Sequence, residues 1–183
     1  MQAFKNNFLK IIALAFVCSC NRQVVPENSY AFHYIKKESK DTLTYYAYKN
    51  IDTAIFYAKK ERKNILVIFS SYSSMAMRNM EWKTLSLYPG RSKIQDHFVL
   101  LWLAVDDRRI LKDTSQVVFW YNQYIRLKEI GDKNKYFEET VFGFSTQPFF
   151  CFIDSLKKPF GKVIGYERDE RKLDDFIASG LKE

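Results

Sequence analysis

The fold is decided by the stretch Asn64-Ile-Leu-Val-Ile-Phe-Ser-Ser-Tyr-Ser-Ser-Met-Ala-Met-Arg-Asn-Met-Glu81. It opens with Ile65–Phe69, a continuous apolar run of the kind that forms a strand covered on both faces. The serine-rich segment Ser70–Ser74 predicts a turn and a helix N-cap, and a helix is expected from about Met75 until Pro89-Gly90 stops it. A buried strand, a turn and a helix together indicate an α/β unit.

Further elements flank this unit. Asp52 is expected to be the N-cap of a helix whose basic end is Lys59–Lys63. A short helix near Ser92–His97 leads into Phe98–Val105, a second apolar run. These two apolar runs are predicted to be the central strands of the sheet, joined by a right-handed helical crossover.

The remainder of the chain predicts an insertion, a hairpin and a closing helix. Residues 106–143 are expected to be partly helical, and their many aromatic side chains are assigned to the core, with display as a contact surface as the alternative. Phe149–Ile153 and Gly161–Gly165 predict a β-hairpin around a polar turn. Asp169–Leu181 predicts an amphipathic helix. Its expected buried face consists of Leu173, Phe176, Ile177 and Leu181.

The first 19 residues resemble a bacterial lipoprotein signal peptide. Lys5 and Lys10 give a basic start, and the apolar segment Ile11–Val17 is too short to span a bilayer. The segment Val17-Cys-Ser-Cys20 resembles the lipoprotein signal, in which a cysteine is lipidated and becomes the mature N-terminus. This implies lipidation at Cys20 and a lipid tether to a membrane of the bacterial envelope. The alternative is an ordinary N-terminal helix with two incidental cysteines.

Composition limits the remaining possibilities. The chain has 183 residues, of which 47% are hydrophobic, which is enough for one well-packed domain. We expect a tether and a candidate edge strand over residues 20–48 and a single domain over residues 49–183. The net charge is +8, but acidic residues interrupt every basic cluster. This pattern argues against nucleic acid as a partner and leaves anionic lipid head groups as a minor use of the charge.

The element order resembles the thioredoxin fold, and the motifs resemble the C-terminal thioredoxin domain of thiol:disulfide interchange proteins, in versions typical of Bacteroidetes. The resemblance covers about residues 50–182. It implies an α/β fold, with a central mixed β-sheet flanked by helices and a helical, aromatic-rich insertion. It also implies a cis peptide bond between Gln147 and Pro148, beside Ser74. The matching segments are Phe69–Tyr72, Arg78–Glu81, Val105–Asp107, Gln147–Phe150 and Gly165-Tyr166.

The chain departs from this family at the redox site. The vestigial active-site positions read Ser74-Met75-Ala76-Met77, with Ser74 and Met77 where the family has its two cysteines. A serine hydroxyl forms no thiolate at neutral pH, and a thioether forms no disulfide. The family's buried carboxylate falls on Ile68. The resemblance therefore implies no catalytic residue, no metal and no cofactor in this chain.

The function expected from these observations is that of a redox-inactive envelope lipoprotein, a binding or scaffolding subunit of a membrane-associated protein assembly. Asn21 after the lipidated cysteine favours the outer membrane, with either face left open. The envelope partner would occupy the groove between the helix start and the Pro148 loop, because thioredoxin-like relatives hold extended polypeptides there.

Three other functions remain alternatives. The first is a thiol-disulfide oxidoreductase or isomerase that works through Cys151 or a partner's cysteines, although Cys151 lies in an aromatic strand pattern that predicts burial. The second is Cu(I) binding by the thioethers of Met75, Met77 and Met80, which are soft ligands but more often fill cores. Serine catalysis at Ser74 would need a neighbouring base, and no pattern puts a histidine there.

Overall fold

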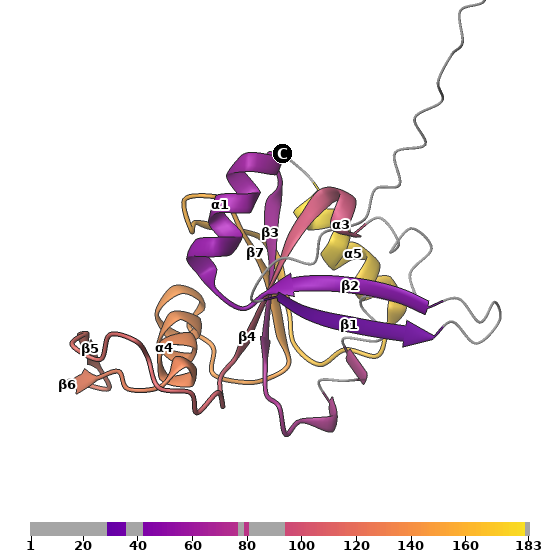
Figure 1. Ribbon diagram of the computed structural model, residues 1–183. Helices are drawn as coiled ribbons and strands as arrows, with labels where there is room; N and C mark the ends of the chain where they lie inside the picture. The colour runs from indigo at the N-terminus through magenta and orange to yellow at the C-terminus, as the bar shows by residue number, and fades with distance from the viewer. Residues whose placement is uncertain (1–28, 36–41, 77–78, 81–93, 182–183) are drawn as a thin grey trace, which may run out of the picture.

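The computed structural model describes residues 29–35, 42–76, 79–80 and 94–181 (Figure 1). The predicted signal peptide, Cys20 and Met77 lie outside these residues. The first half of the chain contains β1 (Ser29–Ile35), β2 (Thr42–Tyr48), α1 (Ile51–Glu61), β3 (Asn64–Ser70), α3 (Ile94–His97) and β4 (Phe98–Ala104). The second half contains β5 (Val117–Trp120), β6 (Gln123–Arg126), α4 (Ile130–Phe142), β7 (Phe149–Ile153), β8 (Pro159–Ile164) and α5 (Glu170–Gly180). No described helix is long and apolar enough to cross a membrane.

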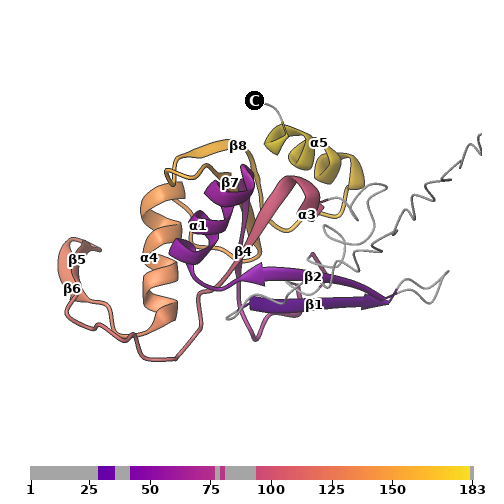
Figure 2. The ribbon, with the colours of Figure 1, turned by 45° about the horizontal axis from the view of Figure 1, so that its top comes forward.

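Six strands form one mixed sheet in the order β1-β2-β4-β3-β7-β8. Strands β2, β4 and β3 run parallel, whereas β1 is antiparallel to β2, β7 is antiparallel to β3, and β8 is antiparallel to β7. The two apolar runs of the sequence, β3 and β4, pair along their whole length at the centre, as predicted. Helices α1 and α4 lie on one face of the sheet, and α3 and α5 lie on the other (Figures 1 and 2). This arrangement confirms the thioredoxin-like fold class.

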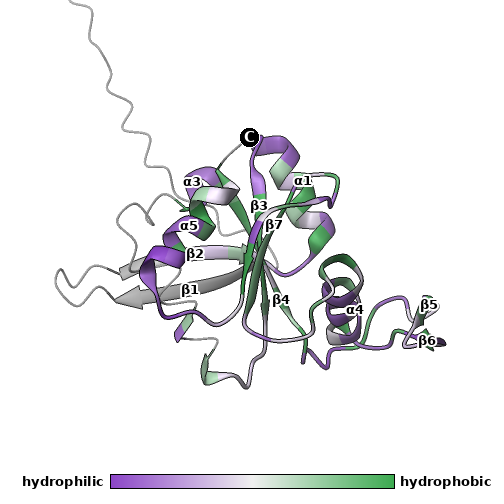
Figure 3. Cartoon of the chain, turned by 180° about the vertical axis from the view of Figure 1, so that it is seen from behind, coloured by the Kyte–Doolittle hydropathy of each residue, from purple (hydrophilic) through white to green (hydrophobic). Residues whose placement is uncertain are grey.

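The core has two halves because alternate residues of each central strand point to opposite faces. Ile65, Val67 and Phe69 of β3 pack with residues of α1. Leu66 and Ile68 pack on the other face with residues of α5. Burial on both faces explains why β3 and β4 are continuous apolar runs. In Figure 3 the hydrophobic strands lie between the helices, and the outer faces of the helices are hydrophilic.

The N-terminal part of the domain differs from the prediction in two respects. The described residues between 20 and 48, which are 29–35 and 42–48, form two strands; β2 is an interior strand that pairs with β4, so the edge strand is β1. The N-cap of α1 is Asn50 and not Asp52, because the Asn50 Oδ1 accepts hydrogen bonds from the backbone N–H groups of Asp52 at 2.9 Å and Thr53 at 3.0 Å. Asp52 lies in the first turn, where its charge suits the helix dipole.

The insertion also differs from the prediction. It contains a β-hairpin, β5–β6, before α4, and the hairpin turns at two residues of positive φ, Tyr121 and Asn122. Phe119, Tyr121 and Tyr124 are exposed, so the assignment of these aromatic rings to the core is wrong. Other aromatic residues of the insertion, Phe137 and Phe142, do pack against the core.

The closing helix is confirmed with one exception. The carboxylate of Asp169 caps α5 by accepting a hydrogen bond from the N–H of Arg171 at 3.0 Å. Of the predicted buried face, Leu173, Phe176 and Ile177 are buried, but Leu181 lies beyond the helix end and is exposed.

Candidate functional site

Four loops meet at one end of the sheet. Because β3 and β4 are parallel, residues 70–76 and 105–107 leave the sheet at the same end. Strand β7 is antiparallel to β3, with Phe69 opposite Phe149, and β8 is antiparallel to β7, with Phe150 opposite Ile164. Residues 144–148 and 165–167 therefore lie at this end too. We call these four loops the loop end; it contains Ser74, Met75, Ala76, Gln147 and Pro148.

The carboxylate of Asp106 holds the turn that precedes Ser74. It accepts hydrogen bonds from the Ser71 hydroxyl at 2.7 Å and from the backbone N–H of Tyr72 at 2.9 Å. Burial alone would raise the pKa of Asp106, but these hydrogen bonds outweigh it and lower the pKa below its ordinary value. Asp106 is thus an ionised acceptor that fixes the backbone of the turn.

Ser74 has no histidine near it in the loop end. The loop end contains no histidine in its sequence, and His97 precedes β4 at the opposite end of the sheet. The backbone N–H of Ser74 donates to the Ser71 carbonyl at 3.2 Å, which continues the turn held by Asp106. This arrangement is that of a turn residue, and none of the four described loops supplies a histidine that could activate a serine nucleophile.

The methionines do not share one environment. Met75 is 70% exposed, whereas Met80 is 0% exposed and packs in the core beside α5. The Met80 sulfur also accepts a hydrogen bond from the backbone N–H of Glu167 at 3.4 Å. A copper site that used both thioethers would require Met80 to leave the core, and Met77 lies outside the described residues.

Cys151 is fully buried in β7, as the aromatic strand pattern predicted. It lies opposite Val67 of β3, on the face of the sheet that α1 and α4 cover. Burial raises the pKa of its thiol well above the ordinary value, and the negative charge of Glu138 raises it further. At neutral pH the thiol is therefore protonated, and it is not accessible to a disulfide in solution.

Glu138 is a buried carboxyl group that the sequence analysis missed. It is 0% exposed, and its Oε2 accepts a hydrogen bond from the side-chain amide of Gln147 at 2.8 Å. Its other oxygen, Oε1, has no hydrogen-bond partner among the described residues. Burial raises the pKa of Glu138 to about 7, against the lowering effect of the Gln147 hydrogen bond. Strand β3 has Ile68 and no carboxyl group at that position, as noted from the sequence, but helix α4 contributes the buried carboxyl group of Glu138.

Glu138 connects α4 to the loop that contains Pro148. The peptide bond between Gln147 and Pro148 is cis, which agrees with the conformation that the resemblance implied. Gln147 is half-buried and Pro148 is buried. The hydrogen bond from Gln147 to Glu138 therefore holds the Pro148 loop in place, just as Asp106 holds the turn before Ser74.

Helix α4 is positioned by polar contacts as well as by the rings of Phe137 and Phe142. Its buried residues are Gly131, Asn134 and Glu138, spaced by three and four positions along one face. The Asn134 side chain donates to the Ala104 carbonyl at 2.8 Å. A Cβ atom on Gly131 would lie 2.6 Å from the Val105 carbonyl oxygen, so only glycine permits this approach. A search for apolar periodicity cannot find such a face; the signal was the three- and four-residue spacing of small and polar residues.

The outer surface of the loop end carries aromatic and apolar side chains among polar ones. Its exposed large side chains are Tyr72, Met75, Phe144 and Tyr166. The ring of Tyr72 rests edge-on against Trp102 with centroids 5.0 Å apart, and Phe144 stacks on Phe149 at 4.7 Å. These rings can contact another molecule by packing.

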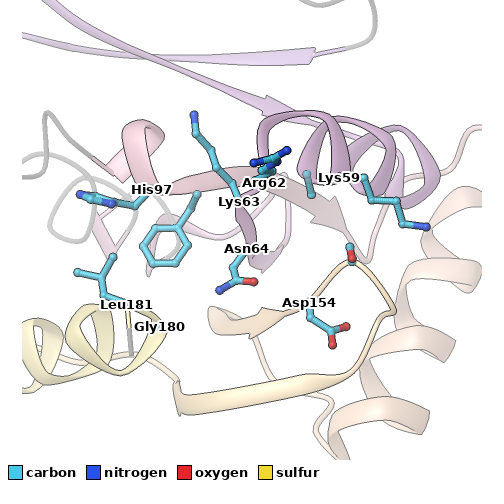
Figure 4. Close-up of a pocket in the computed structure, with 11 residues that line it drawn as sticks. Lys59, Arg62, Lys63, Asn64, His97, Asp154, Gly180 and Leu181 are labelled. Atoms are coloured by element: carbon cyan, nitrogen blue, oxygen red, sulfur yellow. The ribbon is translucent and has the colours of Figure 1, made fainter. Parts of the chain in front are cut away.

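A cavity of about 500 Å³ lies at the opposite end of the sheet (Figure 4). Its polar lining includes Lys59, Arg62, Lys63 and His97. Lys59, Arg62 and Lys63 stand at the C-terminal end of α1, where the helix dipole favours positive charge, and Lys63 pairs with Glu61 at 2.8 Å. His97 is the last residue of α3. Their positions are explained without a ligand, and no residue predicted for a site lines the cavity.

Comparisons with known proteins return only structural similarity. No family model matches the sequence, and no curated protein matches it. One similar solved structure, described as a DsbH oxidoreductase, is 16% identical, covers 73% of this chain and 82% of its own, and gives a TM-score of 0.49. A disulphide isomerase from Xylella fastidiosa Temecula1 is 14% identical, covers 70% and 86%, and gives a TM-score of 0.46. Assignment of the fold rests on the strand order and helix positions described above.

Proposed function

We propose that this chain is a redox-inactive, non-catalytic envelope lipoprotein that acts as a binding or scaffolding subunit of a membrane-associated protein assembly. One observation carries the proposal. At the loop end, where the fold would present a reactive thiol, the chain presents Ser74 and the exposed Met75, while Cys151 is buried.

The occupant of the loop end would be an extended segment of an envelope protein. The main chain beside Pro148 would pair with it as an added strand, and Met75 would supply an adaptable apolar contact. Asp106 holds the turn before Ser74, and Glu138 holds the Pro148 loop, before any partner binds. A surface that is already ordered loses less conformational entropy on association, which favours binding without chemistry.

Attachment to the membrane is the second part of the proposal. The leader pattern supports lipidation at Cys20, which would tether the domain to the bacterial envelope, at the outer membrane by the identity of Asn21. About eight residues would then separate the lipid from β1, which begins at Ser29.

The competing function is thiol-disulfide chemistry through Cys151 or a partner's cysteines. Burial and the raised pKa of the Cys151 thiol both oppose it. A thiol in this position could react only if β7 separated from its neighbours in the sheet.

Site-specific photo-crosslinking tests the binding surface. A photoreactive phenylalanine analogue would replace Met75 in one variant and Phe56 in another, since Phe56 is an exposed residue of α1 outside the loop end. In envelopes from cells, we expect discrete protein adducts with the Met75 variant and not with the Phe56 variant. Equal adducts at both positions, or none at Met75, would count against the loop end as a binding surface.

A further inference from the structure

The β5–β6 hairpin forms a sheet of its own, separate from the six-stranded sheet. Figures 1 and 2 show it on the far side of α4, away from the central strands. Phe119 lies opposite Tyr124, and Val117 lies opposite Arg126. Because side chains alternate along a strand, these four residues share one face of the hairpin, which we call the outer face.

The outer face is strongly exposed. Phe119 is 58% exposed and Tyr124 is 80% exposed, and their rings meet edge to face with centroids 5.4 Å apart. Exposed aromatic rings in contact with each other are costly in water and are typical of a surface that meets another phase or molecule.

The opposite face of the hairpin is fixed to the domain. The indole N–H of Trp120 and the hydroxyl of Tyr121 donate to the two oxygens of Glu139, each at 2.7 Å. Val118 is buried. Anchoring of this kind holds the outer face in place, so the exposed rings are presented on a supported ribbon.

Charge identifies the kind of surface that the outer face fits. The segment from Ser115 to Lys128 contains no acidic residue and two basic ones, Arg126 and Lys128, both exposed. Arg126 stands on the same face as the two rings, and no carboxylate of the described residues pairs with it. Tyrosine and phenylalanine beside arginine are favoured at the interface of a bilayer with anionic lipids, where rings enter the head-group region and the cation meets phosphate.

We propose that the outer face of the β5–β6 hairpin binds an anionic lipid bilayer, with Phe119 and Tyr124 in the interfacial region and Arg126 at the lipid phosphates. The face consists of four side chains, whereas a stable dimer normally buries about 800 Å² on each partner. A small face suffices for a weak, reversible contact with a membrane, and a lipid tether would make that contact intramolecular. The inference uses the tether of the proposed function but does not depend on what the loop end binds.

Hydrogen exchange of the full chain tests the proposal. A Cys20→Ser substitution prevents acylation, and backbone exchange of residues 115–128 is measured with vesicles of phosphatidylcholine alone or mixed with phosphatidylglycerol. Every variant keeps the leader, so any membrane contact made by the leader is the same in all of them. Exchange at residues 115–128 then reports on the hairpin alone. We expect exchange to slow at least about fivefold with the anionic vesicles and less with neutral ones.

Two variants and a control complete the experiment. Phe119→Ser/Tyr124→Ser should abolish the slowing, whereas Phe56→Ser, at an exposed ring on α1, should leave it unchanged. Arg126→Glu, which leaves both rings in place, should remove the preference for anionic vesicles. The proposal is overturned if vesicles do not slow exchange, if neutral and anionic vesicles act equally, or if slowing without vesicles rises with protein concentration, which would indicate a second copy of the chain.

Discussion

Replacement of Glu138 by glutamine should make the stability of the protein less dependent on pH. Burial raises the pKa of Glu138 to about 7 from an ordinary value of 4.5. Between these two values the unfolded chain has lost the proton while the folded chain keeps it. The folded state then binds more protons, so the free energy of unfolding must fall as the pH rises through this window.

The size of the effect follows from the pKa difference. The pKa shift corresponds to a loss of roughly 3 kcal/mol in the free energy of unfolding. This loss is complete above the folded-state pKa of about 7 and absent below the ordinary pKa of 4.5. Because a protein interior responds to a buried charge, we expect a loss of stability of about 1–3 kcal/mol. Glutamine retains an oxygen that can accept the Gln147 hydrogen bond but cannot ionise, so the Glu138→Gln variant lacks this loss.

Urea unfolding at several values between about pH 4.5 and pH 8 measures the effect as a difference between pH values. That difference cancels any constant cost of the glutamine side chain. The matched control is Glu170→Gln, since Glu170 is an exposed glutamate in the first turn of α5. Its curve should run parallel to that of the wild type. Parallel curves for the wild type and Glu138→Gln would refute the reasoning.

Three further predictions concern the loop end and the core beneath it. In a Cys18→Ser/Cys20→Ser background, the Cys151 thiol should react with a disulfide reagent at least about a hundredfold more slowly in the native protein than in urea, because it is buried; equal rates would contradict this. Asp106→Ala should destabilise the protein by about 1 kcal/mol and speed amide exchange at Tyr72, whose N–H donates to the Asp106 carboxylate at 2.9 Å; unchanged exchange would show that the carboxylate does not hold the turn. Gly131→Ala should cost about 1–3 kcal/mol in urea unfolding, because the added Cβ would meet the Val105 carbonyl; an unchanged midpoint would contradict this.

The centre of the fold could be predicted because its buried strands and helix have clear apolar patterns in the sequence. β3 and β4 are covered on both faces, so they are continuous apolar runs, and the closing helix has a clear apolar stripe. Helix caps are harder, because Asn50 and Asp52 lie two residues apart and either can cap a helix. Only the backbone geometry decides that the Asn50 side chain reaches the free N–H groups.

The hairpin was missed because its turn lacks the usual sequence signal. A tight two-residue turn favours Gly at positive φ, but here Tyr121 and Asn122 adopt it. Hydrogen bonds from Trp120 and Tyr121 to Glu139 attach the hairpin to α4. The partners are 19 and 18 positions apart in the sequence, so no local pattern predicts the contact.

The candidate site was predictable in its place but not in its polar supports. The strand-turn-helix stretch and Gln147-Pro148 pointed to the correct end of the sheet, because parallel and antiparallel pairing bring those loops together. Glu138 escaped notice because it shares a buried face with Gly131 and Asn134, and that face has no apolar periodicity. Its burial follows from the close approach of α4 to β4, which is a tertiary property.

The central claim is that the loop end does no disulfide chemistry, and reduction of insulin by dithiothreitol tests it most directly. The full chain with Cys18→Ser/Cys20→Ser, and the same chain with Cys151→Ser added, would be compared with buffer. We predict that both proteins give the rate of buffer alone, because Cys151 is buried and the helix start carries Ser74 in place of a thiol. Acceleration by the first protein that disappears in the Cys151→Ser variant would contradict the account.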